Sequence, residues 1–572
     1  MRSGKAKFKQ LRHFATLAIL PALLLGCASV PRPGATGQSR PPMSASVPDA
    51  RTEGLVKKAQ SALDRGDMQA AQADYARAAM RSGNPDIAAR ATGLALALHD
   101  SDAAEKALAR WKALGADPED VLRARARIAL DQGRTDQARA LLMKLTAGGG
   151  KPAWQAFGKI ILNARDAAQA GQLLQQVATP ARLPDDVLAW LAMSEIGQKL
   201  GRYAYAQQIA DTAAERFRDG RAYAWAGSLE AQRGNDKAAQ AMYARAVKVL
   251  PDNIDLRMAY AGLVAKQGHL AEAGRILARG RQDERTFAAR TAFAARNKDM
   301  KSLGSIYESL TRAPGSVRKK SYYLLGQLAA LLDKPQAAVD WLAKVPPRAE
   351  HGVDAGIRRA VLLQQLGHPG QAHGVLQNMR TVFADQPQIA YRLDRVDAEL
   401  YMQAGDYARA ATAYTRAMAG NADSGELLYG RGLAYAEDGK TAAAVADLRA
   451  VLRLEPDNIN AVNALGYTLA DAGRNLSEAR KLLERAHKAK PDDPAITDSW
   501  GWLQFRLGHL ARAEKALRWS WKQRKDSEVG AHLAQVLLVQ GKRSEARRIY
   551  REALKLAPHN RHLLALRAKF GP

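Results

Sequence analysis

The residue with the clearest chemical potential in this chain is its single cysteine, Cys27. Only Gly26 separates it from an apolar run from Phe14 to Leu25, and five basic residues precede that run. This composition is typical of an export signal, and the run is too short to span a membrane. One thiol in 572 residues excludes a disulfide within the chain, and it excludes cysteine catalysis and thiolate metal sites from the segment after residue 27.

The segment from Leu24 to Cys27 resembles the lipobox of bacterial lipoproteins. That resemblance implies that residues 1–26 are a signal peptide and that Cys27 is acylated, which gives stable membrane anchoring when several acyl chains are attached. Ala28 stands where an aspartate retains such proteins at the inner membrane, so the resemblance implies an outer-membrane protein that faces the periplasm. Residues 27–50 are rich in proline, serine and glycine, and we predict a disordered tether after the lipidated cysteine.

No other residue pattern indicates an enzyme. The eleven histidines are dispersed, and none forms the two-histidine helix motif of zinc proteases. The run from Gly148 to Lys151 looks like part of a phosphate loop, but Pro152 stands where serine or threonine is required. No nucleophile elbow is present. The sequence therefore predicts no catalytic residue, no metal ligand and no cofactor.

Glycines recur at a fixed period in the second half of the chain. Gly405, Gly439, Gly473, Gly508 and Gly541 are 34, 34, 35 and 33 residues apart by subtraction. Each is followed five or six residues later by an alanine and then, four residues on, by a bulky apolar residue. The alanines are Ala410, Ala444, Ala479, Ala513 and Ala546, and the bulky residues are Tyr414, Leu448, Leu483, Leu517 and Tyr550. This pattern resembles the tetratricopeptide repeat (TPR), a pair of helices joined by a tight turn.

The same period continues toward the N-terminus through Gly268, Gly234 and Gly201. It weakens between Gly268 and Gly367, where we expect degenerate repeats or plain helix pairs, and roughly 14 hairpins fit in the chain. We predict an all-α solenoid that winds as a right-handed superhelix. Its expected parts are an N-terminal helical-repeat region at 51–390, TPR repeats at 391–558 and a C-terminal capping helix at 559–572.

The first helices of successive TPR units are expected to line a concave groove that binds extended peptides. Counting positions within the units that begin at Ile459 and Pro494 places six side chains on this groove. Amide, aromatic and arginine side chains suit a peptide because they offer hydrogen bonds and stacking surfaces. The alternative is that the rings of Trp502 and Phe505 only pack against the next hairpin. The predicted groove residues are Asn463, Tyr467, Asp498, Trp502, Phe505 and Arg506.

The formal net charge is +29, and removing the five basic residues of the signal leaves +24. Such a charge can attract anionic head groups, cell-wall carboxylates or acidic proteins. It can equally reflect an arginine-rich composition on solvated helix faces. No compact arginine-aromatic module is present, so we expect no nucleic-acid partner.

The block from Asn463 through Trp521 resembles a recurring segment of outer-membrane TPR lipoproteins, in particular of the family of lipoprotein binding partners of a periplasmic carboxyl-terminal processing protease. It contains Asn463-Ala-Leu-Gly-Tyr467-Thr-Leu-Ala-Asp471 and Asp498-Ser-Trp-Gly-Trp502. The resemblance implies a non-enzymatic scaffold whose partners are periplasmic proteins, among them a protease and its cell-wall hydrolase substrates. The alternative is an assembly factor for a secretion, pilus or exopolysaccharide export system. A cell-wall enzyme is the third class considered, and we expect no such activity.

Overall fold

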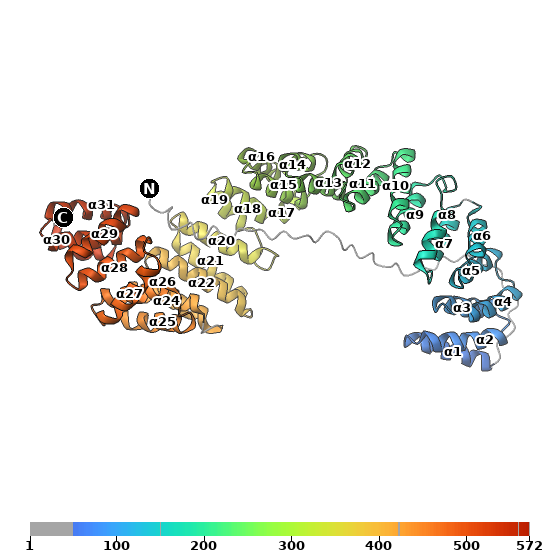
Figure 1. Cartoon of the computed structure of the whole chain (residues 1–572), viewed down its shortest axis with the longest axis horizontal. Helices are drawn as coiled ribbons and strands as arrows, with labels where there is room; N and C mark the ends of the chain where they lie inside the picture. Colours follow the sequence, from blue (N-terminus) through green and yellow to red (C-terminus); the bar gives the residue numbers. More distant parts are fainter. Residues whose placement is uncertain (1–49, 149, 421–423, 559, 571–572) are drawn as a thin grey trace. The chain divides into compact units, whose positions relative to one another are not determined.

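The computed structural model describes residues 50–148, 150–420, 424–558 and 560–570. The predicted signal peptide, Cys27 and the tether up to residue 49 lie outside this part. The described residues form helices joined by short turns, with no strand among them (Figure 1). In this part of the chain, no helix combines the length and the apolar character needed to cross a membrane.

The chain divides into two compact units between residues 306 and 307. In each unit, consecutive helices pair into hairpins that stack on their neighbours along the sequence. Helix α16 (Met300–Thr311) contains the point of division. The helices before it are α1 (Ala50–Asp64), α2 (Met68–Arg81), α3 (Pro85–Ala97), α4 (Ser101–Ala113), α5 (Pro118–Asp131), α6 (Thr135–Thr146), α7 (Lys151–Leu162), α8 (Ala167–Val177), α9 (Val187–Lys199), α10 (Tyr203–Phe217), α11 (Gly220–Gln232), α12 (Asp236–Val249), α13 (Ile254–Lys266), α14 (Leu270–Ala278) and α15 (Glu284–Arg296).

The C-terminal unit continues the same arrangement. Helical hairpins occur on both sides of the predicted boundary between residues 390 and 391, which lies inside α22, and the last helix lies within the predicted capping segment. Its helices are α17 (Gly315–Lys320), α18 (Tyr322–Leu331), α19 (Pro335–Leu342), α20 (Gly352–Gln365), α21 (Pro369–Val382), α22 (Pro387–Ala404), α23 (Tyr407–Ala417), the 3₁₀ turn η3 (Met418–Gly420), α24 (Gly425–Glu437), α25 (Thr441–Leu454), α26 (Ile459–Asp471), α27 (Leu476–Ala489), α28 (Pro494–Arg506), α29 (Leu510–Gln523), α30 (Ser527–Val539), α31 (Arg543–Leu556) and α32 (Arg561–Phe570).

Helix α28 illustrates how the local sequence sets one hairpin. The Asp493 side chain caps its start by accepting hydrogen bonds from the backbone N–H groups of residues 495 and 496. Pro494 occupies the first helical position, where a missing N–H costs nothing. After the helix ends, Gly508 takes φ +81°, a left-handed conformation that glycine adopts readily, and the chain turns into α29.

The turns between Gly268 and Gly367 explain why the glycine period is lost there. Lys298 and Asp333 adopt φ values of +54° and +56°, which are the left-handed conformations that glycine supplies in other hairpins. His99 does the same between α3 and α4, with φ +56°. The hairpins are therefore retained where the glycine is absent, and these turns carry the strain of a non-glycine residue.

The recurring alanines lie at the closest approaches between helices. All five, from Ala410 to Ala546, are fully buried, and the bulky residues four positions later are at most 8% exposed. Small residues on the facing helix complete the fit: a Cβ added to Gly466 would lie 2.7 Å from Leu483 Cγ, and one added to Gly501 would lie 2.8 Å from Leu517 Cγ. The residues that recur with the repeat period therefore form the packed surface between the two helices of each hairpin.

Replacing Gly466 with alanine should destabilise the C-terminal unit by about 1–3 kcal/mol, because the added methyl group overlaps Leu483 in a packed core. Hydrogen exchange of α26 and α27 would report the change locally. The matched control is Gly374→Ala in α21, where an added Cβ meets no atom within 4 Å and should stabilise by about 0.5–1 kcal/mol. Equal effects of the two substitutions would contradict this account of the packing.

Candidate functional site

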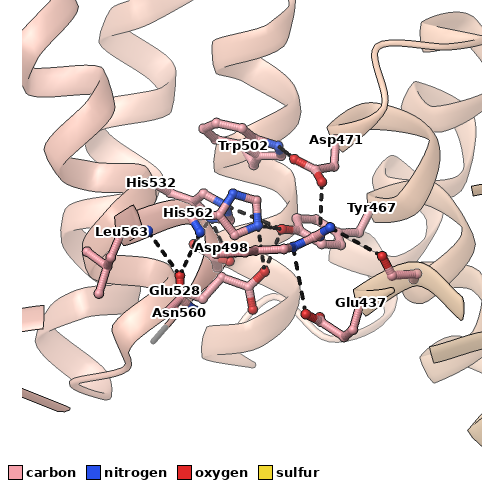
Figure 2. A network of polar contacts seen from close by, with 12 residues as sticks. Glu437, Tyr467, Asp471, Asp498, Trp502, Glu528, His532, Asn560, His562 and Leu563 are labelled. Atoms are coloured by element: carbon pink, nitrogen blue, oxygen red, sulfur yellow. Dashed lines mark hydrogen bonds and ion pairs between the residues drawn. The ribbon is translucent and has the colours of Figure 1, made fainter. Parts of the chain in front are cut away.

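The six predicted groove residues lie on two neighbouring first helices. Asn463 and Tyr467 are on α26, and the other four are on α28. The structure brings Tyr467, Asp498 and Trp502 into one polar network with residues of α30 and α32 (Figure 2). The Asn463 side-chain oxygen is buried without a hydrogen-bond partner and takes no part in this network.

The Tyr467 hydroxyl is the centre of the network. It lies 2.5 Å from Glu528 Oε1, 3.3 Å from His532 Nε2 and 3.2 Å from His562 Nε2. These partners are 61 to 95 residues away in sequence. A single tyrosine on α26 therefore joins α30 and the start of α32.

His532 is fixed by a carboxylate and by an aromatic ring. Its Nδ1 lies 3.1 Å from Asp498 Oδ1, and its imidazole stacks on Trp502 with ring centroids 4.1 Å apart. His532 is fully buried, while Asp498 and Trp502 are nearly so. Phe505 in turn stacks on Trp502, with the two ring centroids 5.0 Å apart. The aromatic rings thus pack around the histidine.

Asp471, at the end of α26, accepts hydrogen bonds from three side chains. The indole N–H of Trp502 donates to Oδ1 at 3.1 Å, and the Arg561 guanidinium donates to Oδ2 at 3.0 Å. Arg506 donates to the backbone carbonyl oxygen of the same residue at 2.6 Å. Two of the predicted groove residues, Trp502 and Arg506, are therefore held against their own repeat array.

The C-terminal helix supplies the remaining contacts. Asn560 caps α32 by accepting hydrogen bonds from the backbone N–H groups of His562 and Leu563 (Figure 2). Arg561 reaches back 125 residues to donate to the carbonyl oxygen of Ala436, and it lies 3.7 Å from the Glu437 carboxylate. Tyr467 and Trp502, two of the predicted groove residues, are thus contacted by His562 of α32, and a peptide binding at these two side chains would have to displace this helix.

Burial and charge shift the ionisation of this network. Burial, reinforced by Glu437 and Asp498, raises the pKa of Glu528 to about 7. Burial also lowers the pKa of His562 to about 2, with His532 and Arg561 adding to the shift, so its imidazole is neutral at pH 7. Burial lowers the pKa of His532, but the Asp498 carboxylate outweighs this effect and the net shift is upward.

Glu528, His532, Arg561 and His562 are not among the residues predicted from the sequence. For Glu528, His532 and His562 the signal was the repeat period itself: Asp498 and His532 are 34 residues apart, and so are Glu528 and His562. Glu528 and His532 are also four residues apart on one helix, which places them on the same face. Searching equivalent repeat positions for titratable residues would have found this group.

A separate cleft of about 400 Å³ lies in the N-terminal unit, between the first helices α9, α11 and α13. Its wall includes Leu191, Leu256 and the indole of Trp225, with Glu195 and Arg221 also contributing. The Trp225 N–H donates to Ser194 Oγ at 2.8 Å, and this hydroxyl in turn donates to a backbone carbonyl oxygen. The tryptophan is therefore held in place before any partner binds.

Comparison with known families agrees with the stacked hairpins and the 34-residue period. A model of the tetratricopeptide repeat matches residues 397–459, and a second one matches residues 435–499. The chain therefore carries tetratricopeptide repeats over residues 397–499. Its fold is an all-α TPR solenoid, as the glycine and alanine period predicted.

Three curated proteins share parts of this TPR sequence. TPR repeat-containing protein PA4667 of Pseudomonas aeruginosa is 36% identical over 215 residues, covering 38% of this chain and 36% of that protein. Bacteriophage adsorption protein A of Escherichia coli is 39% identical over 97 residues, covering 17% of this chain and 10% of that protein. Cellulose synthase operon protein C of Xanthomonas axonopodis is 28% identical over 300 residues, covering 50% of this chain and 16% of that protein. The chain therefore matches about a third or less of each relative's length.

Among solved structures, a tetratricopeptide repeat protein from Parabacteroides merdae aligns with 43% of this chain and 96% of its own, at 16% identity and a TM-score of 0.39. A likeness this weak carries no argument about function. What the TPR repeats do imply is a protein–protein interaction scaffold.

Replacing Arg561 with glutamine should loosen α32, because Ala436 loses a hydrogen bond and the Asp471 and Glu437 carboxylates lose their cation. We expect a loss of about 1–2 kcal/mol in the local stability of α32. Hydrogen exchange of residues 560–570 measures it. Arg567→Gln, on the exposed face of the same helix, is the control and should leave the exchange unchanged.

Proposed function

We propose that this TPR protein is a non-enzymatic, membrane-anchored scaffold in the periplasm of a Gram-negative bacterium, and that it brings peptidoglycan hydrolases to a carboxyl-terminal processing protease. The observation that carries the binding role is the cleft between α9, α11 and α13. The Leu24 to Cys27 segment supports the lipid anchor, and the Asn463 to Trp521 block supports the protease as a partner.

The cleft has the composition expected of a peptide-binding surface. The Trp225 indole is preorganised by its hydrogen bond to Ser194, so binding does not have to pay the entropy of ordering it. Leu191 and Leu256 provide apolar contact, while Arg221 and Glu195 offer charged groups to the same partner. An aromatic anchor with polar neighbours is the usual form of a binding hot spot.

Scaffolding supplies a mechanism without any catalytic group. When a protease and its substrate bind the same array, their encounter becomes intramolecular, and the effective concentration can raise the rate on the order of 10²-fold or more where the geometry fits. A lipid anchor on Cys27 would confine this encounter to the membrane surface.

Photo-crosslinking can test the cleft directly. A photoreactive amino acid at Ala224, which lines the cleft, should capture periplasmic proteins in intact cells, including a processing protease and cell-wall hydrolases. The matched position is Gln208, an exposed residue on the second helix α10, where we expect little capture. Capture of proteins that include no protease or hydrolase would contradict the proposed role in proteolysis. Equal capture at both positions would contradict partner binding at the cleft.

The lipid anchor has its own test. Metabolic labelling with a fatty-acid analogue should mark the wild-type protein and leave Cys27→Ser unlabelled, because the thiol is the only acyl acceptor of its kind in the chain. Fractionation should place the labelled protein in the outer membrane. An unlabelled wild-type protein would contradict the anchor while leaving the binding role of the cleft standing.

A second candidate is an assembly factor for a secretion, pilus or exopolysaccharide export system. The similarity over 300 residues to the cellulose synthase operon protein of Xanthomonas axonopodis favours the exopolysaccharide form of this function. A deletion strain separates the two candidates. Accumulation of cell-wall hydrolases supports the protease scaffold, whereas loss of piliation or polymer export supports the assembly factor.

A further inference from the structure

Three side chains with metal-binding atoms converge where α30 meets the start of α32. Glu528, His532 and His562 each offer one ligand atom, and these atoms all lie within 4.8 Å of one another. We propose that they bind a divalent first-row transition-metal ion, best fitted by Zn²⁺, with the Tyr467 hydroxyl at the fourth position. Two imidazoles and one carboxylate are a ligand set that zinc accepts.

Three of the distances between the candidate ligand atoms are close to those of a tetrahedral site. Zinc bonds of about 2.0–2.1 Å place neighbouring ligand atoms about 3.3 Å apart. His562 Nε2 lies 3.5 Å from Glu528 Oε1, and the Tyr467 hydroxyl lies 3.2 Å and 3.3 Å from the two imidazoles. The Tyr467 hydroxyl lies only 2.5 Å from Glu528 Oε1, so these two atoms must move apart by rotation of their side chains to admit an ion.

Asp498 provides the outer contact that a ligating histidine needs. Its carboxylate oxygens lie 3.1 and 3.2 Å from His532 Nδ1, so the proton is held on Nδ1 and the Nε2 lone pair points toward the other ligands. Metal-bound histidines usually donate their second ring N–H to a carboxylate in this way. Stacking on Trp502 fixes the plane of the same ring.

The hydrogen-bond count leaves room for a cation. Around the Tyr467 hydroxyl stand the Glu528 carboxylate, His532 Nε2 and His562 Nε2. When Glu528 is ionised and both imidazoles are neutral, the hydroxyl has one proton to share among them. Clustered acceptors without enough donors are costly in a partly buried place such as this one. A bound ion satisfies all three at once.

The local charge also favours a cation, although the chain as a whole is strongly basic. Four carboxylates belong to the network drawn in Figure 2 or to its immediate contacts, those of Glu437, Asp471, Asp498 and Glu528. Arg561 is the arginine that pairs with two of these carboxylates, those of Glu437 and Asp471, whereas Arg506 donates only to the backbone carbonyl oxygen of Asp471.

Bound zinc would have a structural role at this position. With the Tyr467 hydroxyl in the fourth place, the coordination is closed, and closed sites stabilise folds rather than bind substrate. The ion would join α26, α30 and α32 and thereby hold the C-terminal helix on the array. Its binding energy would add to the stability of this end of the protein.

The test is a metal titration of the full chain, stripped of metal by a chelator. We expect one Zn²⁺ per chain in competition with a chromophoric chelator, and Co²⁺ in its place should show the visible absorption of a four-coordinate ion. Glu528→Gln and His562→Ala should each weaken binding at least about 100-fold, and Asp498→Asn about 10- to 100-fold. His487→Ala is the control, because that ring stacks on Trp500 outside the cluster, and it should bind as the wild type does.

Circular dichroism checks that each variant keeps its helices, and the melting temperature gives a second readout, since a ligand of the folded state raises it. Zinc should raise the melting temperature of the wild type and of His487→Ala, but not that of His562→Ala. The site is refuted if the wild type binds no ion at one per chain, or if Glu528→Gln and His562→Ala bind as tightly as the control.

Discussion

The constant length of the repeat is the constraint on which the rest of this structure depends. Because most hairpins have nearly the same length, a residue in one first helix lies beside its equivalent in the next. Fully buried alanines at the helix crossings allow the approach, and glycines such as Gly466 accept the bulky residue of the facing helix. The Asp498 and His532 contact, across 34 residues, follows directly from this register.

The sequence carried enough information to predict the class of fold and much of its packing. Each repeat needs a glycine with positive φ in its turn and a small alanine in its buried interior, so both residue types recur at the repeat spacing in the sequence. The period failed between Gly268 and Gly367, because Lys298 and Asp333 adopt the left-handed turn conformation without being glycine. A sequence pattern detects only the residue type at each position. The packing of neighbouring hairpins can hold a turn in the left-handed conformation even where the residue is not glycine.

The candidate site was predictable only in part, for a different physical reason. Counting repeat positions correctly placed Tyr467, Asp498 and Trp502 on neighbouring first helices. It could not show that the chain end returns to them, because the Arg561 contact with Ala436 spans 125 residues and follows no period. The role of these side chains in binding a peptide stays a prediction, and in the structure their polar atoms are engaged by α30 and α32.

The return of α32 to α24 and α26 also sets an order of events during synthesis. In a repeat array each hairpin needs only its neighbours, so the chain can fold progressively as it leaves the ribosome. Arg561 and His562 follow these helices in the sequence, so their contacts on α24 and α26 form only after the chain has been synthesised as far as α32. These contacts link hairpins that are not neighbours, so the last four repeats should unfold cooperatively, whereas a simple solenoid can lose its end repeat alone.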